Sequence, residues 1–253
     1  MPQNLAPPKE LADRVDAFWV HEGRGASVRV LPDGCMDFWF DLDSGQARLI
    51  GTMSEAAIVF VPARARRFGV RFRPGAAAEY VMEAIPGLLD ADPPLDDVTR
   101  AARFFLGERI AAARDHAARI AVMIDFLLAP ASRARPRDAR VGRAVRLLRG
   151  LPGRTPVREV ASTLGVGERQ LERLFVERVG IGPKRFARIA RLERAVALFE
   201  TPVRRQAALA ARAGYADESH LIREFKALAA VTPSELARER HVGFVQSPQL
   251  RPR

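Results

Sequence analysis

Two stretches of the chain decide its fold: residues 158–199, REVASTLGVGERQLERLFVERVGIGPKRFARIARLERAVALF, and residues 208–236, ALAARAGYADESHLIREFKALAAVTPSEL. Both contain an alanine four residues before a glycine, and then a leucine, an arginine and a phenylalanine at intervals of two: Ala161, Gly165, Leu171, Arg173 and Phe175, and again Ala210, Gly214, Leu221, Arg223 and Phe225. Alanine lets two helices approach closely, and glycine adopts turn conformations that other residues resist. Each copy therefore predicts a helix, a tight turn and a second helix, the helix-turn-helix arrangement.

The charge of the chain is divided unevenly around these repeats. Residues 1–128 hold 15 Lys and Arg against 18 Asp and Glu, whereas residues 129–253 hold 26 against 12. Only three of the 41 basic residues are lysine, which indicates an arginine-rich composition, but such a bias does not explain why the N-terminal half is slightly acidic. A segment with a net charge of +14 is suited to the phosphates of nucleic acid. Two helix-turn-helix patterns in this segment predict a protein that binds double-stranded DNA.

The C-terminal half is expected to form an all-α domain of about seven short helices, at 141–149, 157–164, 168–178, 183–199, 203–213, 217–227 and 233–239. Pro156, Pro183, Pro202 and Pro233 lie near helix starts, where a missing amide hydrogen costs little. The helix over 183–199 joins the two helix-turn-helix motifs and would be roughly 25 Å long. That length suits two recognition helices placed about one turn of DNA apart.

These stretches resemble the AraC/XylS family of bacterial transcription regulators, and the segment GYADESHLIREFK with the following TPSE is especially similar to the family's second motif. The segments LPDGCMDFWF (31–40) and FGVRFRPGAAAEY (68–80) resemble, more weakly, a β-rich domain that precedes some such regulators. The resemblance implies sequence-specific binding to promoter DNA, with an N-terminal domain for effector sensing or dimerisation.

The resemblance also implies a set of DNA-binding residues on the second helix of each motif. These are Arg169, Glu172 and Arg173 on the first recognition helix, and Glu218, Ser219, His220 and Arg223 on the second. Arginine suits the guanine edge and glutamate accepts from cytosine. Pairing within the helix is the alternative for the arginines, and simple solvation for the histidine. Gly167 departs from the family, which often has a capping Ser or Thr there.

The N-terminal half predicts an α+β domain, a small β-barrel or sandwich with helices. We expect a helix over residues 10–20, although its C-terminal end would also fit a strand. Strands 28–31 and 35–42 should form a hairpin. Further strands are expected at 48–50, 58–62 and 68–73, and a helix at 76–84. Met36, Phe38, Phe40, Val70 and Phe72 should form a packed core, with a pocket wall as the alternative, and Arg71 and Arg73 should point outward. Asp37 and Asp41 with Arg71 and Arg73 favour cross-strand ion pairs over a ligand site.

The expected domains are residues 1–128, a linker at 129–140, the DNA-binding domain at 141–240 and a flexible tail at 241–253. Helical periodicity over 97–128, through Val98, Phe105, Ile110, Ile120, Ile124 and Leu127, predicts helices that cover the sheet or form a dimer surface. A homodimer, a small-molecule effector and RNA polymerase remain open as further partners.

The composition argues against other functions. The only cysteine is Cys35, and the four histidines lack metal-ligand spacing, so we expect no metal, cofactor or catalytic residue. No apolar stretch is long enough to span a bilayer, which predicts a cytoplasmic protein without a membrane partner. Two alternatives stay open: a repair or redox-sensing protein that uses Cys35 and is fused to a DNA-binding module, and a non-specific nucleoid-binding protein.

Overall fold

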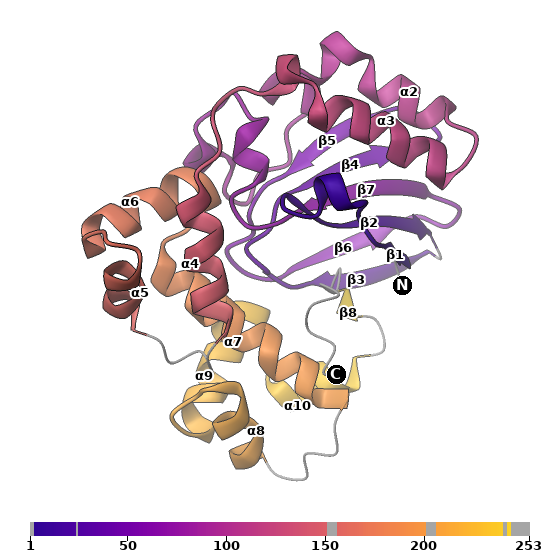
Figure 1. Cartoon of the computed structure of the whole chain (residues 1–253). Coiled ribbons are helices and arrows are strands. Elements are labelled where there is room, and N and C mark those ends of the chain that lie inside the picture. Colours follow the sequence, from indigo (N-terminus) through magenta and orange to yellow (C-terminus); the bar gives the residue numbers. More distant parts are fainter. Residues whose placement is uncertain (1–2, 24, 151–155, 201–205, 240–241, 244–253) are drawn as a thin grey trace.

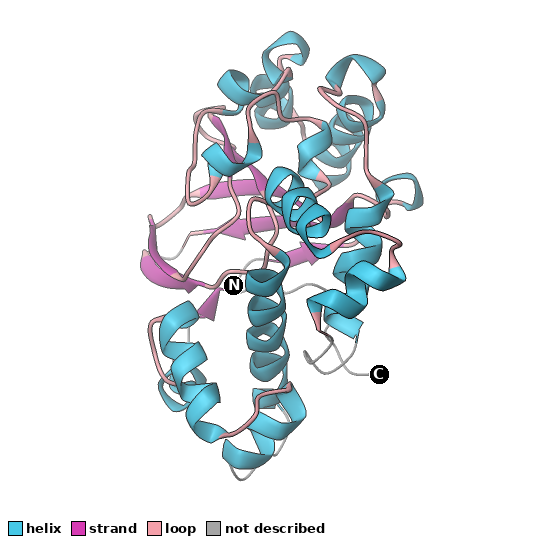
Figure 2. Ribbon diagram, turned by 90° about the vertical axis from the view of Figure 1, so that its left-hand side faces the viewer, coloured by secondary structure: helices cyan, strands magenta, loops and turns pink. Residues whose placement is uncertain are grey.

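The computed structural model describes residues 3–23, 25–150, 156–200, 206–239 and 242–243 of the 253-residue chain. A β-rich N-terminal region is followed by a helical C-terminal region (Figure 1). Figure 2 shows the strands gathered in the middle of the molecule with helices on both sides.

A five-stranded antiparallel sheet forms the centre of the N-terminal region. Its strands, in spatial order, are β1 (Gln3–Leu5), β2 (Val15–Glu22), β7 (Arg66–Phe72), β4 (Asp37–Asp41) and β5 (Ala47–Ile50). One face of this sheet carries the side chains expected to form a core, and Met36, Phe38, Phe40, Val70 and Phe72 are all buried there. The expectation of a packed core on this face is confirmed.

A second sheet of three strands packs on the other side, and consists of β6 (Ala57–Val61), β3 (Ala26–Val30) and the parallel β8 (Val242–Gly243). The two sheets make the region a sandwich, as expected. The hairpin of residues 28–42 is wrong, because β3 pairs with β6 whereas β4 pairs with β5 and β7. The Pro32–Gly34 turn instead carries the chain from one sheet to the other. β8 lies within the expected tail, and the rest of residues 241–253 is outside the described residues.

The helix expected over residues 10–20 is wrong for most of its length. A single 3₁₀ turn, η1 (Lys9–Leu11), is followed by β2, which pairs with β1 and β7. Leu11, Val15 and Phe18 are buried. A strand that is buried on both faces has apolar residues at every spacing, including the helical one, and this explains the wrong prediction. Similarly, residues 76–84 contain only the 3₁₀ turn η2 (Ala77–Glu79).

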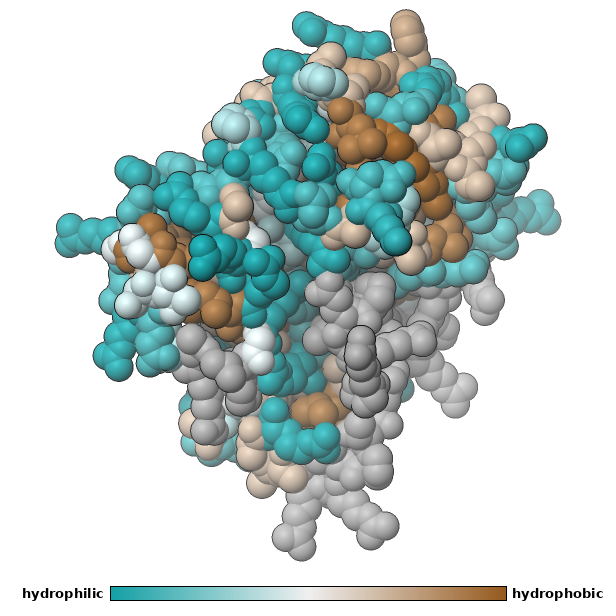
Figure 3. Space-filling view, viewed as in Figure 1, coloured by the Kyte–Doolittle hydropathy of each residue, from teal (hydrophilic) through white to brown (hydrophobic). Residues whose placement is uncertain are grey.

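Short helices cover the core face of the five-stranded sheet: η3 (Ile85–Leu88), α1 (Leu95–Val98), η4 (Ala101–Phe104), α2 (Leu106–Ala112) and α3 (His116–Leu128). Asp115 caps α3 by accepting from the Ala118 amide at 2.8 Å. Ile110, Met123, Phe126 and Leu127 are buried against the sheet, so these helices cover it, one of the two roles expected for them. In Figure 3 an apolar strip lies over this part of a largely hydrophilic face.

The C-terminal helices follow the expected pattern closely. They are α4 (Ala139–Gly150), α5 (Val157–Thr163), α6 (Glu168–Val179), α7 (Pro183–Ala197) with η6 (Leu198–Glu200), α8 (Gln206–Ala213), α9 (Glu218–Ala229) and α10 (Pro233–Arg238). Residues 203–205 of the expected fifth helix lie outside the described residues.

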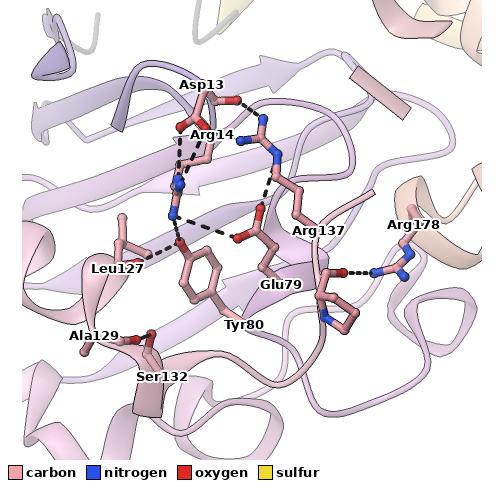
Figure 4. Close-up of polar contacts among 10 residues, drawn as sticks. Asp13, Arg14, Glu79, Tyr80, Leu127, Ala129, Ser132, Arg137 and Arg178 are labelled. Atoms are coloured by element: carbon pink, nitrogen blue, oxygen red, sulfur yellow. Dashed lines mark hydrogen bonds and ion pairs between the residues drawn. The ribbon is translucent and has the colours of Figure 1, made fainter. Parts of the chain in front are cut away.

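The segment between the two regions is held against the N-terminal region (Figure 4). It contains η5 (Pro130–Ser132), and the Ala134 amide donates to the Glu79 carbonyl at 2.7 Å. Arg137 forms ion pairs with Asp13 and Glu79. Arg178 of α6 donates to the Pro136 carbonyl at 3.0 Å. This segment therefore contacts a helix of the first helix-turn-helix motif directly.

Candidate DNA interface

The first helix-turn-helix motif consists of α5 and α6. Ala161 is buried where the helices meet, and Gly165 has a φ of 68°, the left-handed conformation that glycine adopts without strain. Leu171 and Phe175 of α6 are fully buried. Arg169, Glu172 and Arg173 lie on the opposite, exposed side of α6. No side chain caps the start of α6 at Gly167, in agreement with the departure noted in the sequence.

Local contacts of these exposed residues are weak. The Arg173 Nε lies 3.8 Å from the Glu177 Oε1, and both side chains are mostly exposed, at 72% and 59%. Such a pair contributes little and leaves the guanidinium available. The Glu172 carboxylate lies against Gly182 at the start of α7, where a Cβ would collide with it.

The second motif, α8 and α9, repeats the first. Gly214 has a φ of 91°, and Leu221 and Phe225 are fully buried. Asp217 caps α9 by accepting from the His220 amide at 2.6 Å.

Three of the four expected residues of α9, Glu218, Ser219 and Arg223, are exposed. His220 is half-buried, because its ring contacts Tyr215 edge to face at 5.4 Å and its Nδ1 accepts from the Ala216 amide at 3.3 Å. His220 therefore helps to shape the turn.

Helix α7 packs against both motifs. The Phe186 ring packs edge to face on Phe175 of α6, with centroids 5.8 Å apart. Glu224 of α9 accepts from Arg188 at 2.6 Å and from Arg191 at 3.0 Å. Each recognition helix is thus anchored to α7 through residues on its buried side, while the arginines of its exposed side stay outside these contacts.

A groove of about 820 Å³ lies between the motifs. Its lining includes Arg158, Lys184, Arg188 and His220. Apart from His220, these residues were not expected as site residues, and the only signal in the sequence was the general basic charge of this half. A groove with this lining suits an anionic backbone.

The N-terminal region contacts the C-terminal end of each recognition helix. At α6, the Thr52 hydroxyl donates to the Val179 carbonyl at 2.5 Å in a fully buried position. At α9, the Ala56 amide donates to the Leu228 carbonyl at 2.8 Å, and Arg29 donates to the Ala229 carbonyl at 3.0 Å. The sequence did not indicate these contacts.

The turn between the two sheets forms a third contact. Leu31 belongs to the core of the helical region, and a Cβ on Gly34 would lie 2.6 Å from the Phe186 ring. The Asp33 carbonyl accepts from Arg149 of α4 at 3.1 Å. Arg149 also pairs with Glu193 of α7 at 3.2 Å, and burial raises the pKa of Glu193 to about 7 against the opposing effect of Arg149.

A cavity of about 200 Å³ lies between the two sheets, on the face opposite the packed core. Both Trp19 and Trp39 line it, together with valines of β3 and β6. Arg71 lies at its wall, 3.3 Å from Asp33 and 3.5 Å from Asp37. Arg71 is 3% exposed, so its expected outward position in solvent is wrong: the second sheet covers this face.

The cross-strand pair expected for Asp37 and Arg71 is present, because the two residues are direct neighbours on β4 and β7. Burial raises the pKa of Asp37 to about 6, while Arg71 opposes this shift. The other expected members have different partners: Arg73 lies 3.8 Å from Asp16, and Asp41 accepts from the hydroxyl and amide of Ser44. The Asp37–Arg71 pair also lines the cavity.

Cys35 is buried beside this cavity, and burial together with Asp33 raises the pKa of its thiol well above the ordinary value. Such a thiol is a poor nucleophile. Among the described residues, no three His, Cys, Asp or Glu side chains gather as metal ligands would, and no helix has the length and apolar character needed to cross a membrane.

Two family matches divide the chain in the same way as its fold. Residues 160–239 match a family described as "Helix-turn-helix domain", and residues 3–92 match one described as "Domain of unknown function (DUF6597)". Among curated proteins, the comparison finds no match to this chain.

Solved structures give weaker similarities. A transcriptional regulator with an AraC-type DNA-binding domain from Chromobacterium violaceum is 24% identical over 40% of this chain and 95% of its own, with a TM-score of 0.38. ToxT from Vibrio cholerae strain SCE256, with bound unsaturated fatty acid, is 14% identical over 94% of this chain and 97% of its own, with a TM-score of 0.47. Similarity at this level is low, and the family matches and the site geometry carry the assignment.

Tandem helix-turn-helix motifs whose recognition helices expose arginine side chains define a DNA-binding protein. More particularly, the chain carries a domain of this helix-turn-helix family at residues 160–239, behind an N-terminal DUF6597 domain at residues 3–92.

Proposed function

We propose that this regulator reads two successive major-groove segments of promoter DNA, one with α6 and one with α9. The observation that carries the proposal is the equivalence of the two helices. Each has an exposed arginine between a buried leucine and a buried phenylalanine, and each is anchored to α7.

The residues proposed to contact DNA are Arg169, Glu172, Arg173, Glu218, Ser219, His220 and Arg223. Arginine donates to guanine O6 and N7 and glutamate accepts from cytosine N4, so this mixture favours base discrimination over uniform phosphate binding. Because His220 already contacts Ala216 and Tyr215, we assign it to positioning the start of α9 as well as to DNA.

Competition binding tests this proposal against non-specific nucleoid binding. Sites are first selected from random duplexes with the full chain, and one selected site is then titrated against unrelated DNA at two salt concentrations. We expect binding that weakens steeply with salt and a preference of at least roughly a thousandfold for the selected site. Equal affinity for both DNAs would support the non-specific alternative.

We further propose that residues 1–128 form a regulatory domain connected through residues 129–140 to the DNA-binding domain at 141–240. The contacts of Thr52, Ala56 and Arg29 with the ends of α6 and α9 support this role. A shift of the N-terminal domain at these contacts changes the orientation of both recognition helices.

The cavity between the sheets is the proposed effector site. Its indole and valine walls suit a small apolar molecule, and the guanidinium of Arg71 suits a hydrogen-bond acceptor on that molecule. Asp33 connects the cavity to the helical region, because its carboxylate pairs with Arg71 while its carbonyl accepts from Arg149. A ligand that draws Arg71 away from Asp33 therefore acts on the turn that contacts α4 and α7.

Tryptophan fluorescence provides a direct test, since the chain has two tryptophans and both line the cavity. We expect a small-molecule screen to yield ligands that change the emission and shift the affinity for DNA. Val61→Phe, which places a larger side chain in the cavity, should abolish the emission change while DNA binding without ligand persists. An effector that shifts DNA affinity equally in both proteins would contradict this site.

RNA polymerase is a further proposed partner on functional grounds, because a promoter-bound regulator acts on transcription, and the bacterial cytoplasm is then the compartment. The buried, high-pKa thiol of Cys35 gives little support to the repair or redox alternative, and we assign no catalytic residue.

A further inference from the structure

Strand β6 has an open outer edge. It is the end strand of its sheet, and among the described residues only β3 pairs with it. Residues 57–60 are all exposed, with Ile58 at 59% and Phe60 at 60%. No charged residue occurs between Ala56 and Pro62. Edge strands are normally protected by charges, bulges or short length, so an apolar edge of this kind is suited to pairing with another strand.

We propose that β6 pairs with β6 of a second copy of this chain, antiparallel, about a two-fold axis that passes through Val59. In this register Ile58 of each copy lies opposite Phe60 of the other, on the outer face of the sheet. An interface formed by the same patch on both copies must be self-complementary, and this register satisfies that condition with two apolar cross-strand pairs.

The charges that flank the strand favour the same orientation. Glu55 precedes β6 and Arg64 follows it, and both are exposed. Antiparallel pairing brings Glu55 of each copy close to Arg64 of the other, whereas parallel pairing in register would bring like charges together. Opposite charges across strands are favourable and like charges are not.

The helices over 97–128 are the alternative dimer surface, but most of their apolar residues are buried within the N-terminal region. Ile110, Met123, Phe126 and Leu127 are buried against the five-stranded sheet. Phe105, at 68% exposed, and Leu128, at 37%, are the large apolar side chains exposed in this part of the chain. Unlike Ile58 and Phe60, they do not lie on an unpaired backbone edge.

The location of β6 connects the dimer to the proposed regulation. Val59 and Val61 line the cavity between the sheets, so the paired strands would form one wall of the effector site in each copy. This inference deepens the proposed regulatory role of the N-terminal domain. Its test reads the oligomeric state without DNA, so its failure leaves the proposed DNA recognition unaffected.

Sedimentation velocity of the full chain over a range of concentrations tests the interface. We expect a dimer for the unmodified protein and a monomer for Ile58→Lys/Phe60→Lys, whose exposed positions tolerate lysine without loss of the fold by circular dichroism. The matched control, Phe105→Lys, should remain dimeric. A monomeric unmodified protein, or a double variant that still dimerises, overturns the proposal.

Charge reversal tests the orientation independently. Glu55→Arg and Arg64→Glu should each raise the dimer dissociation constant, roughly three- to tenfold. The double variant Glu55→Arg/Arg64→Glu restores opposite charges in the antiparallel register and should return the constant to within about twofold of the original. If the double variant dimerises no better than the single variants, the antiparallel register is wrong.

Discussion

Arg173 and Arg223 occupy matching positions on α6 and α9, and both are exposed beside buried leucine and phenylalanine side chains. The pattern of the sequence was sufficient to predict this, because a residue two positions from each of two core residues that are four apart lies on the opposite side of the helix. The structure adds that the contact of Arg173 with Glu177 is long and exposed, so it competes weakly with a base.

Arg173→Ala and Arg223→Ala should each reduce discrimination between the selected site and a site with one mutated half by roughly 1–3 kcal/mol. The reason is the loss of the proposed bidentate contact with guanine. Quantitative gel-shift titration measures the ratio of the two affinities. Arg103→Ala, an exposed arginine of the N-terminal region, is the control and should leave the ratio unchanged. A uniform loss of affinity for all sequences would assign these arginines to phosphate.

Gly34 is a second residue on which the account depends. Gly34 and Gly45 have almost the same φ, 73° and 74°, but a Cβ on Gly34 meets the Phe186 ring at 2.6 Å whereas one on Gly45 has its nearest neighbour at 4.0 Å. Alanine is strained in both conformations.

Gly34→Ala should therefore destabilise the protein more than Gly45→Ala, by roughly 1–3 kcal/mol beyond the shared backbone cost. Denaturant unfolding followed by circular dichroism measures both variants. Equal losses of unfolding free energy in the two variants would mean that Gly34 does not pack closely against Phe186 of α7 in solution.

At the scale of elements, helices were easier to predict than strand pairing. Apolar residues at helical spacing mark the C-terminal helices, and prolines mark the starts of three of them, α5, α7 and α10. These local signals largely set the helix bounds. The β2 strand lacks such a signal: Val15, Phe18 and Trp19 are buried on both faces, and a short apolar run fits helix and strand equally. Likewise, Pro32–Gly34 predicts a turn, but a turn alone does not determine which strands pair.

The α4–α7 pair of Arg149 and Glu193 predicts a pH dependence. Burial raises the folded pKa of Glu193 to about 7, from its ordinary value of 4.5. The unfolded state then holds fewer protons than the folded state between these values. The contribution of this group is therefore most favourable below about pH 4.5 and is lost as the pH rises to about 7.

Glu193→Gln removes this titration, so the stability of the variant relative to the original protein should rise between pH 5 and pH 7.5, by roughly 1–3 kcal/mol. Urea unfolding at several pH values measures the difference. A flat difference for Glu193→Gln would mean that its pKa is not raised by burial.

At the scale of the whole molecule, the separation of charge anticipated the division into an acidic β-rich region and a basic helical region. The contacts between the regions were not predictable. The donors Thr52, Ala56 and Arg29 are far in sequence from the acceptors Val179, Leu228 and Ala229. The acceptors are backbone carbonyl groups, which every residue has, so no side-chain type marks them in the sequence. The cavity was missed for a related reason. Its wall is the second face of the central sheet, and that face is buried only because another sheet covers it.

The central claim is that α6 and α9 read two major-groove segments side by side. Methylation-interference footprinting of the full chain on its selected site tests this most directly, because methylation of guanine N7 blocks contacts in the major groove. The account predicts two clusters of interfering guanines, about 10 base pairs apart on one side of the duplex. A single cluster, or interference that is spread evenly along the DNA, would contradict it.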